Sequence, residues 1–167
     1  MIVLVASRIE AVIYDGGGRP AGLSREWRAV PLLAGLTLVP VTEDMAVRLD
    51  QGAVGGDRIR AGWMLRPPVA ALARGLSAGR RVLYIVGETF AGTGAQEAIG
   101  WQDERLLYGP SGSCDLEADR EPGYDVVTRA DSAINRGLRA LGVRAGPGQD
   151  EYQAAGLDRH RWTEDWT

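Results

Sequence analysis

Lysine is absent from this chain, and all 19 of its basic residues are arginine. The absence of lysine excludes the phosphate-binding lysine of a P-loop, Schiff-base chemistry and a lysine general base. A bias toward Arg, Gly and Ala is what a GC-rich genome produces through its codons. We therefore attribute most of the arginine usage to the genome and little of it to function.

Cysteine and histidine occur once each, as Cys114 and His160. A single cysteine permits no intrachain disulfide, which agrees with a reducing compartment. One cysteine and one histidine cannot form a structural zinc site within one chain. No run approaches the roughly 18 apolar residues that span a bilayer, and the start MIVLVASRIE does not match a signal peptide. We expect a cytoplasmic protein with no metal and no cofactor.

A concentrated positive charge is also lacking, because acidic and basic residues are mixed and the net charge is −3. General nucleic-acid binding needs a clustered positive footprint, and so does binding to an anionic membrane surface. We expect a protein partner, with no nucleic acid and no membrane. The oligomeric state stays open.

The 167 residues are most simply one domain, 1–167, that is long enough to bury a core. Apolar and β-branched runs predict strands at 2–6, 10–14, 36–41, 58–65, 81–90, 95–101, 105–109 and in YDVVT. Helical spacing, capping residues and Pro67-Pro68 predict helices at 42–51, 67–78 and 131–141, with a short one near 150–156. The expected fold class is α+β: a largely antiparallel sheet with a central hairpin at 81–101, covered by three or four helices.

The segment GETFAGTGAQEA at 87–98 allows two interpretations. A dinucleotide-binding loop needs a strand, G-x-G-x-x-G and a helix. Gly92 and Gly94 supply two glycines, but Glu97 stands at the third position, where its carboxylate would face an anionic ligand. The following AQEAIGW makes a poor helix. Two β-rich runs around a short turn instead predict a hairpin, and we favour the hairpin.

The hairpin loop is still a candidate binding element, because loops held by a sheet often carry function. Thr93 lies in the 91–94 loop that would make such contacts. Glu88, Gln96 and Glu97 flank it, and we expect them on a solvated strand face. Glu88 and Glu97 are nevertheless weak catalytic candidates, as carboxylates that could act as an acid or a base.

Residues 110–123, PSGSCDLEADREPG, predict a polar loop. Its acidic residues alternate: Asp115, Glu117, Asp119 and Glu121. That spacing resembles a calcium loop, but Arg120 occupies the glycine position and Val126 the position of the bidentate glutamate. We therefore interpret the segment as a solvated acidic loop that could contact a partner.

GPSGS at 109–113 resembles the nucleophile elbow G-x-S-x-G, but its last residue is Ser113. The elbow must also pass directly from a strand into a helix, whereas an acidic loop follows here. This segment therefore argues against a serine hydrolase.

His160 is the remaining catalytic candidate. It stands in DRHRWTEDW with carboxylates nearby, so it could serve as a general base, either alone or as a dyad with Cys114. The plainer interpretation is a structural or surface histidine and a small buried cysteine. The sequence leaves both open.

The tail combines aromatic and basic residues. Trp162 and Trp166 are four apart, which places them on one face of a helix, and Arg161 lies beside them. Trp and Arg are enriched where protein interfaces gain their binding energy. The alternative is that both tryptophans pack back onto the domain and fix its terminus.

Three segments of the second half, GETFAGTGAQEAIGW, INRGLRALGV and DEYQAAGLDRHRWTEDW, carry a resemblance. Together they resemble a group of small uncharacterised proteins from high-GC actinobacteria. The group has no established activity, so the resemblance implies no catalytic residues. In size and acidity such proteins are similar to immunity proteins.

Two functions follow as expectations. The first is a non-catalytic protein-binding domain, possibly of the immunity type that inhibits a toxin, with contacts from Thr93, Gln96, Asp115, Glu117, Asp119, Arg161, Trp162 and Trp166. The alternative is a small enzyme that uses carboxylates or His160 on an anionic small molecule. The enzyme hypothesis requires His160, Glu88 and Glu97 to converge in one pocket.

Overall fold

The computed structural model describes residues 6–52, 64–90 and 93–166. Its strands are β1 (Ser7–Asp15), β2 (Val30–Pro31), β3 (Leu36–Pro40), β4 (Arg81–Phe90), β5 (Thr93–Gln102), β6 (Arg105–Cys114) and β7 (Tyr124–Val126). Its α-helices are α1 (Glu43–Gly52), α2 (Pro67–Leu76), α3 (Ala133–Ala140) and α4 (Glu151–Ala154). Short 3-10 turns occur at 117–119, 129–131, 157–159 and 163–166.

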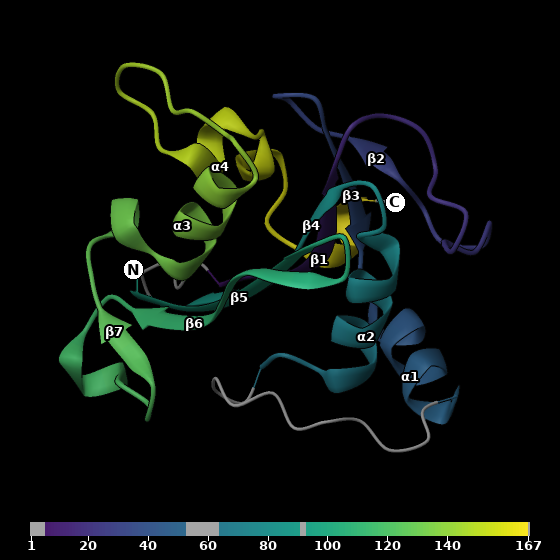
Figure 1. Ribbon diagram of the computed structural model, residues 1–167. Coiled ribbons are helices and arrows are strands. Elements are labelled where there is room, and N and C mark those ends of the chain that lie inside the picture. The colour runs from purple at the N-terminus through teal and green to yellow at the C-terminus, as the bar shows by residue number, and fades with distance from the viewer. Residues whose placement is uncertain (1–5, 53–63, 91–92, 167) are drawn as a thin grey trace.

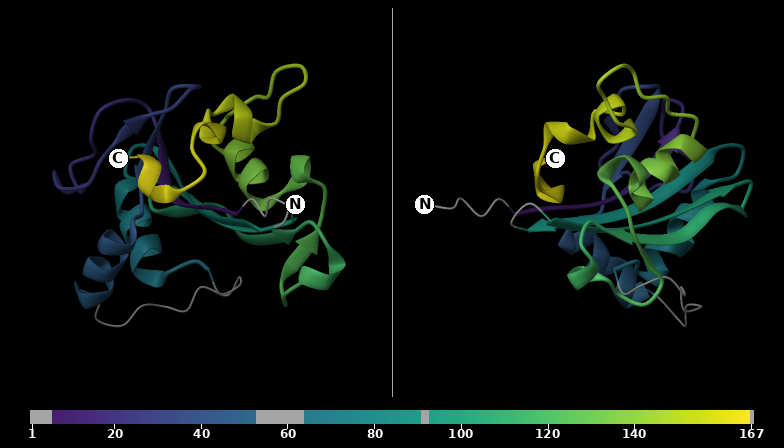
Figure 2. Two further views of the ribbon diagram at one scale, coloured as in Figure 1. Left: turned by 180° about the vertical axis from the view of Figure 1, so that it is seen from behind. Right: turned by 90° about the vertical axis from the view of Figure 1, so that its left-hand side faces the viewer.

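The strands form one sheet in the order β2-β3-β1-β4-β5-β6-β7. Neighbours are antiparallel except for β6 and β7, which are parallel. Helices α1 and α2 cover one face, and α3, α4 and the C-terminal tail cover the other (Figures 1 and 2). The predicted α+β class, the antiparallel sheet and the helical cover are therefore confirmed.

Both faces of the central strands are buried, and the side chains alternate between two cores. Val12, Tyr84 and Val86 pack with α1 and α2 in one core. Ile13 and Ile85 pack with α3 and the tail in the other. Because side chains alternate along a strand, each central strand supplies both layers. This explains why β1 and β4 read as nearly continuous apolar runs.

The hairpin interpretation of the glycine segment is confirmed. Strands β4 and β5 are antiparallel, and Phe90 pairs with Thr93 across the turn. A strand, not a helix, follows Gly94, so the geometry of a dinucleotide loop is absent from β5. Residues 91–92 of the proposed contact loop lie outside the described residues.

Two local predictions are corrected or fall outside the description. The polar loop expected at 110–123 begins later, because β6 continues to Cys114 and includes GPSGS. That strand extends because β5 pairs with it on one side and β7 on the other. Most of the strands expected at 2–6 and 58–65 lies outside the described residues, and residues 64–65 form a bend.

Glu97 is fully buried, which corrects the expected solvated position. Its carboxylate accepts hydrogen bonds from the backbone N–H groups of Met64 (2.9 Å) and Leu65 (2.8 Å) and from the Tyr124 hydroxyl (2.8 Å). A buried carboxylate is tolerated when such donors replace water. Burial, followed by this hydrogen bond, raises the pKa of Tyr124 above its usual range, so the hydroxyl stays a donor.

A second buried carboxylate, Glu10, lies in the same row of the sheet, since Glu10 pairs with Val86 and Val86 pairs with Glu97. Its oxygens accept a bond from the Tyr84 hydroxyl (2.8 Å) and face the Arg66 guanidinium at 3.2 Å. The Arg66 N–H donates to the Tyr84 oxygen. Glu10 and Glu97 thus hold residues 64–66, the entry to α2, against the sheet.

The C-terminal tail is docked along the first half of β1. Arg8 N–H donates to the Arg161 carbonyl at 3.0 Å, and Glu10 N–H donates to the Thr163 hydroxyl at 2.9 Å. Trp166 is only 2% exposed, whereas Trp162 is 44% exposed. The expected shared helix face is therefore wrong, because a 3-10 turn begins at Thr163 and leaves Trp162 outside it.

Replacement of Glu97 by glutamine tests the buried clamp, by which we mean the Glu97 carboxylate and its three hydrogen-bond donors. We expect Glu97→Gln to lower the free energy of unfolding by about 1–3 kcal/mol, because an amide cannot accept all three bonds and one donor is left unpaired. Urea unfolding measures it. The half-exposed Glu88 is the control, and Glu88→Gln should cost less than about 1 kcal/mol. Equal midpoints for the two variants would contradict the clamp.

The two tail tryptophans should differ in their effect on stability. Trp166→Ala removes a buried ring and should cost about 3–5 kcal/mol. Trp162→Ala should change the free energy of unfolding by about 0.5 kcal/mol or less, as at an ordinary surface position. Thermal and urea unfolding distinguish them, and a large loss in Trp162→Ala would show that the tail is docked in another way.

Candidate functional site

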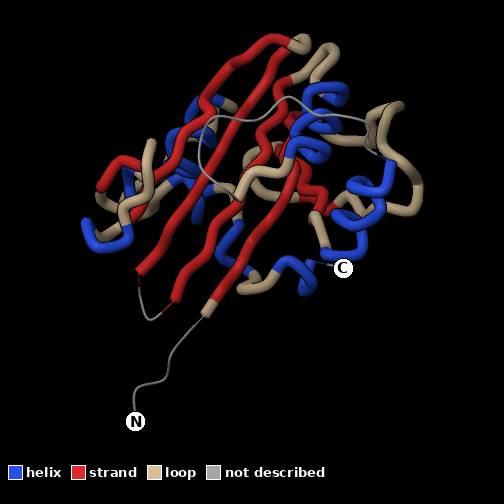
Figure 3. The backbone as a smooth tube through the Cα atoms, turned by 90° about the horizontal axis from the view of Figure 1, so that it is seen from below, coloured by secondary structure: helices blue, strands red, loops and turns tan. Residues whose placement is uncertain are grey.

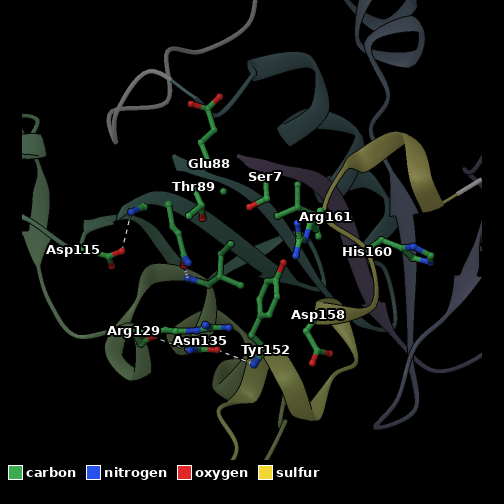
Figure 4. A pocket seen from close by; sticks show the side chains of 15 residues that line it. Ser7, Glu88, Thr89, Asp115, Arg129, Asn135, Tyr152, Asp158, His160 and Arg161 are labelled. Atoms are coloured by element: carbon green, nitrogen blue, oxygen red, sulfur yellow. Dashed lines mark hydrogen bonds between the residues drawn. The ribbon is translucent and has the colours of Figure 1, made fainter. Parts of the chain in front are cut away.

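A cavity of about 300 Å³ lies between the sheet, α3, α4 and the tail. It is on the α3 face, at the end of the sheet where Ser7 of β1 pairs with Thr89 of β4. Figure 3 shows that β1 begins and β4 ends at this same end of the sheet. Figure 4 shows the side chains that line it.

The sheet supplies one wall. Ser7 and Ile9 come from β1, Gly87 and Thr89 from β4 and Gln96 from β5. They share a face because they are spaced by two along each strand. Gly87 lets α3 approach closely: an added Cβ would lie 3.1 Å from Cδ1 of Ile134. The cavity therefore has an apolar floor of Ile9 and Ile134 beneath polar side chains.

The opposite wall comes from α3 and α4 and is fixed by hydrogen bonds. The Gln96 amide oxygen accepts from the Ile134 N–H at 3.1 Å, which ties the start of α3 to β5. Asn135 donates from Nδ2 to the Arg129 carbonyl and accepts from the Tyr152 N–H, both at 2.8 Å. Side chains held in this way keep their positions without a ligand.

The caps of the two helices explain this arrangement. The Ser132 side chain accepts from the N–H of Asn135 and begins α3. Asp150 and Gln153 form a capping box at α4. A capping box satisfies two backbone groups at a helix start. It fixes the first turn of α4 and therefore the direction of Tyr152.

The acidic loop and the tail complete the rim. The Asp115 carboxylate accepts from the Gly94 N–H at 2.8 Å, which joins the end of β6 to the hairpin. Asp158, His160 and Arg161 line the side formed by the tail. Arg129 reaches in from the turn before α3 and is paired with Asp150 at 3.1 Å.

The structure brings several sequence-predicted residues together here. Gln96, Asp115 and Arg161 all line the cavity. Glu117 and Asp119 are exposed on the 3-10 turn just after Asp115. The remaining predicted contacts are placed differently: Thr93 pairs with Phe90 in the hairpin, Trp162 is exposed beside Arg161, and Trp166 is buried under the tail.

The catalytic candidates do not converge. Glu97 belongs to the opposite face of the sheet, with Ile99 and Trp101. Glu88 and His160 contribute to the lining, but the Glu88 side chain points away and pairs with Arg8 (Figure 4). The His160 ring also points away and packs edge-on against Trp166, with centroids 4.7 Å apart.

Cys114 and His160 form no dyad. Cys114 is 2% exposed and packs in the core on the α1 and α2 face, and its thiol donates to the Leu116 carbonyl. Burial raises the pKa of the Cys114 thiol, which disfavours the reactive thiolate. The expected small buried cysteine is therefore confirmed.

Sequence reasoning missed six polar residues that line the cavity: Ser7, Thr89, Arg129, Asn135, Tyr152 and Asp158. Asn135 stands in the first turn of α3, next to Ile134, and gave no signal that separates it from an ordinary helical residue. Tyr152 stands in the short segment near 150–156 that the sequence predicts only as a helix, and Asp158 is the first residue of the tail that follows it. Nothing in the chain order places either one beside β4 and β5.

Comparison with known proteins gives no identification. No family model, curated protein or solved structure matches this chain. The resemblance to the actinobacterial group therefore stays a prediction. Within the described ranges, no helix is long and apolar enough to cross a membrane. Across the same ranges, no group of three or more His, Cys, Asp or Glu side chains is placed to hold a metal ion.

Tyr152 makes the polarity of the cavity measurable. Burial raises the pKa of Tyr152 to about 12, against an ordinary value near 10. Because the folded-state pKa is the higher one, the neutral hydroxyl favours folding below about pH 10, and this contribution is lost as the pH rises toward about 12. The tyrosinate absorbance of the wild type is titrated, and the titration of Tyr152→Phe is subtracted from it. The difference belongs to Tyr152, and in the folded protein its midpoint should lie near pH 12.

The control is the same pair of titrations in urea, where the midpoint of the Tyr152 difference should move to about pH 10. Circular dichroism on each sample records that the native series stays folded. A midpoint of about pH 10 for Tyr152 in the folded protein would mean that its hydroxyl is fully hydrated, and would contradict the prediction.

Proposed function

We propose that this chain is a non-catalytic domain that binds a protein partner through the surface around the cavity. The observation that carries the proposal is convergence. Three segments that are far apart in the sequence, the β4–β5 hairpin, the start of the acidic loop and the tail, meet at one rim through Gln96, Asp115 and Arg161. Loops and chain ends positioned by a rigid sheet are where binding surfaces usually arise.

Large apolar side chains stand next to each of these segments. Trp162 is 44% exposed beside Arg161, and Leu116 is 48% exposed beside Asp115. Phe90, which is 62% exposed, follows Thr89 at the hairpin and lies on the Glu88 side of β4, away from the cavity. An exposed tryptophan, an arginine and an exposed leucine next to rim residues have the composition of an interface hot spot with a polar rim.

The acidic loop gives this surface its charge. Asp115, Glu117 and Asp119 are exposed in succession beside the cavity. Arg120 pairs with Glu117 at 3.2 Å and offsets only part of that charge. Acidic side chains of this kind accelerate association with a basic surface. A basic partner, such as a toxin whose active site is covered by this face, is the most concrete form of the proposal.

The proposal is tested in two steps. A tagged chain is used to isolate partners from the native host, and a stoichiometric partner that survives moderate salt is purified. Calorimetry for affinity, and stopped-flow kinetics at two salt concentrations for the association rate, then compare wild type with Trp162→Ala and Asp119→Ala. We expect Trp162→Ala to weaken binding about tenfold or more, as at a hot spot. Asp119→Ala should mainly slow association and reduce its dependence on salt.

Leu106→Ala is the matched control, because Leu106 is 59% exposed at the start of β6, the end of that strand away from Cys114. It should leave the affinity unchanged. If no stoichiometric partner is recovered, or if Leu106→Ala weakens binding while Trp162→Ala does not, the proposed surface is wrong.

A further inference from the structure

Two oppositely charged side chains line the cavity without a partner. Arg161 and Asp158 both border it and are three residues apart. Neither makes an ion pair or a side-chain hydrogen bond with any residue of the described ranges. Other charged groups at the rim are already engaged, since Arg129 pairs with Asp150, Glu88 pairs with Arg8, and Asp115 accepts from the Gly94 N–H. Among the described lining residues, Arg161 and Asp158 are thus the cation and the anion that no hydrogen bond or ion pair engages.

Uncharged donors accompany the arginine. Within the described residues, the Gln96 oxygen is taken by the Ile134 N–H, which leaves the amide N–H₂ of Gln96 free. In the same ranges the Tyr152 hydroxyl has no hydrogen-bond partner, and Figure 4 shows it directed into the cavity with Arg161 beside it in that view. A guanidinium with neutral N–H and O–H donors is the usual receptor for a carboxylate.

Acceptors are present on the same lining. Asp158 lines the cavity and stands next to Tyr152 in Figure 4, and no group of the described residues bonds its carboxylate. Asp115 uses one carboxylate oxygen for the Gly94 N–H, and no described group bonds the other. Figure 4 places Asp115 on the opposite side of the cavity from Asp158, so Asp158 is the carboxylate that would meet an ammonium group beside Tyr152. An ammonium group has three donors and no acceptor.

We propose that the cavity binds a small zwitterion, a free α-amino acid, with its carboxylate toward Arg161 and Tyr152 and its ammonium toward Asp158. Arg161 and Asp158 are exposed charges that stay hydrated without a ligand. A zwitterion would pair with both of them, whereas a simple anion would pair only with Arg161 and a simple cation only with Asp158. The volume of about 300 Å³ is at the lower end for small-ligand sites. The floor of Ile9 and Ile134 would receive the aliphatic part of the ligand.

This proposal does not rest on the protein-binding function, and it is tested on the isolated full-length chain. The twenty common L-amino acids are screened by calorimetry at millimolar concentration. Each one that binds is compared with its analogue lacking the ammonium group and its analogue lacking the carboxylate. For L-leucine these are 4-methylpentanoate and 3-methylbutylamine. We expect each analogue to bind about tenfold more weakly or worse, since each loses a charge-assisted contact.

Arg161→Gln and Asp158→Asn should each weaken the amino acid about tenfold, by the same argument. Arg48→Gln and Asp44→Asn, charge-matched changes on α1 across the sheet, should leave the affinity unchanged. Circular dichroism confirms that all four variants are folded. Three outcomes overturn the proposal: no amino acid binds, one singly charged analogue binds as tightly as its parent, or the Arg161 and Asp158 variants bind like wild type.

Discussion

The pairing of the C-terminal tail with the open edge of β1 is the constraint on which the cavity side of the molecule depends. Strand β3 covers only Ala11–Asp15 of β1, so the first half of that strand lacks a neighbour there. The Arg8 N–H reaches the Arg161 carbonyl, and the Glu10 N–H reaches the Thr163 hydroxyl. Without these bonds, buried backbone groups of β1 would be unpaired, at a cost comparable to a lost hydrogen bond each.

The same docking creates the site. Anchoring Trp166 and Thr163 fixes the chain just before them, so Asp158, His160 and Arg161 are held above the sheet. The guanidinium of Arg159 stacks over the Trp166 ring at 5.1 Å, and His160 packs against its edge. The His160 ring therefore helps to hold the tail, because it packs against Trp166, and this accounts for its direction away from the cavity. Arg161 and Asp158 are the tail residues that the proposed ligand would contact.

The other face shows how buried charge can order a fold. Glu10 and Glu97 are both withdrawn from water, and each is surrounded by donors from the entry to α2 and from tyrosines. Such carboxylates contribute little net stability beyond what apolar residues would give, but loss of one partner is costly. Their effect is to fix the position of residues 64–66, because in that position both carboxylates have their hydrogen-bond donors. Tyr124, which donates to Glu97, fixes the position of β7 in the same way.

The sequence predicted those parts of the fold that short-range patterns control. Pro67-Pro68 marked the start of α2, and the continuous run of apolar and β-branched residues in 81–90 marked β4, because local geometry determines both. Glu97 was expected on a solvated strand face but is buried, because its partners Met64, Leu65 and Tyr124 are remote in the chain and give no local signal. An acidic residue in a strand is ordinarily exposed, and only the three-dimensional fold brings the donors that reverse this expectation.

The candidate site illustrates the same limit more strongly. Gln96, Asp115 and Arg161 were singled out separately, but their convergence depends on the strand order and on the docked tail, neither of which leaves a local signature. Tyr152 and Asn135 were missed because each resembles an ordinary helical residue. Their mutual bond, and that of Gln96 to Ile134, are long-range hydrogen bonds that hold the walls in place before any ligand arrives. The side chains of these walls are then already ordered in the folded protein. Binding of a ligand to Arg161 and Asp158 would therefore not carry the further conformational-entropy cost of ordering them.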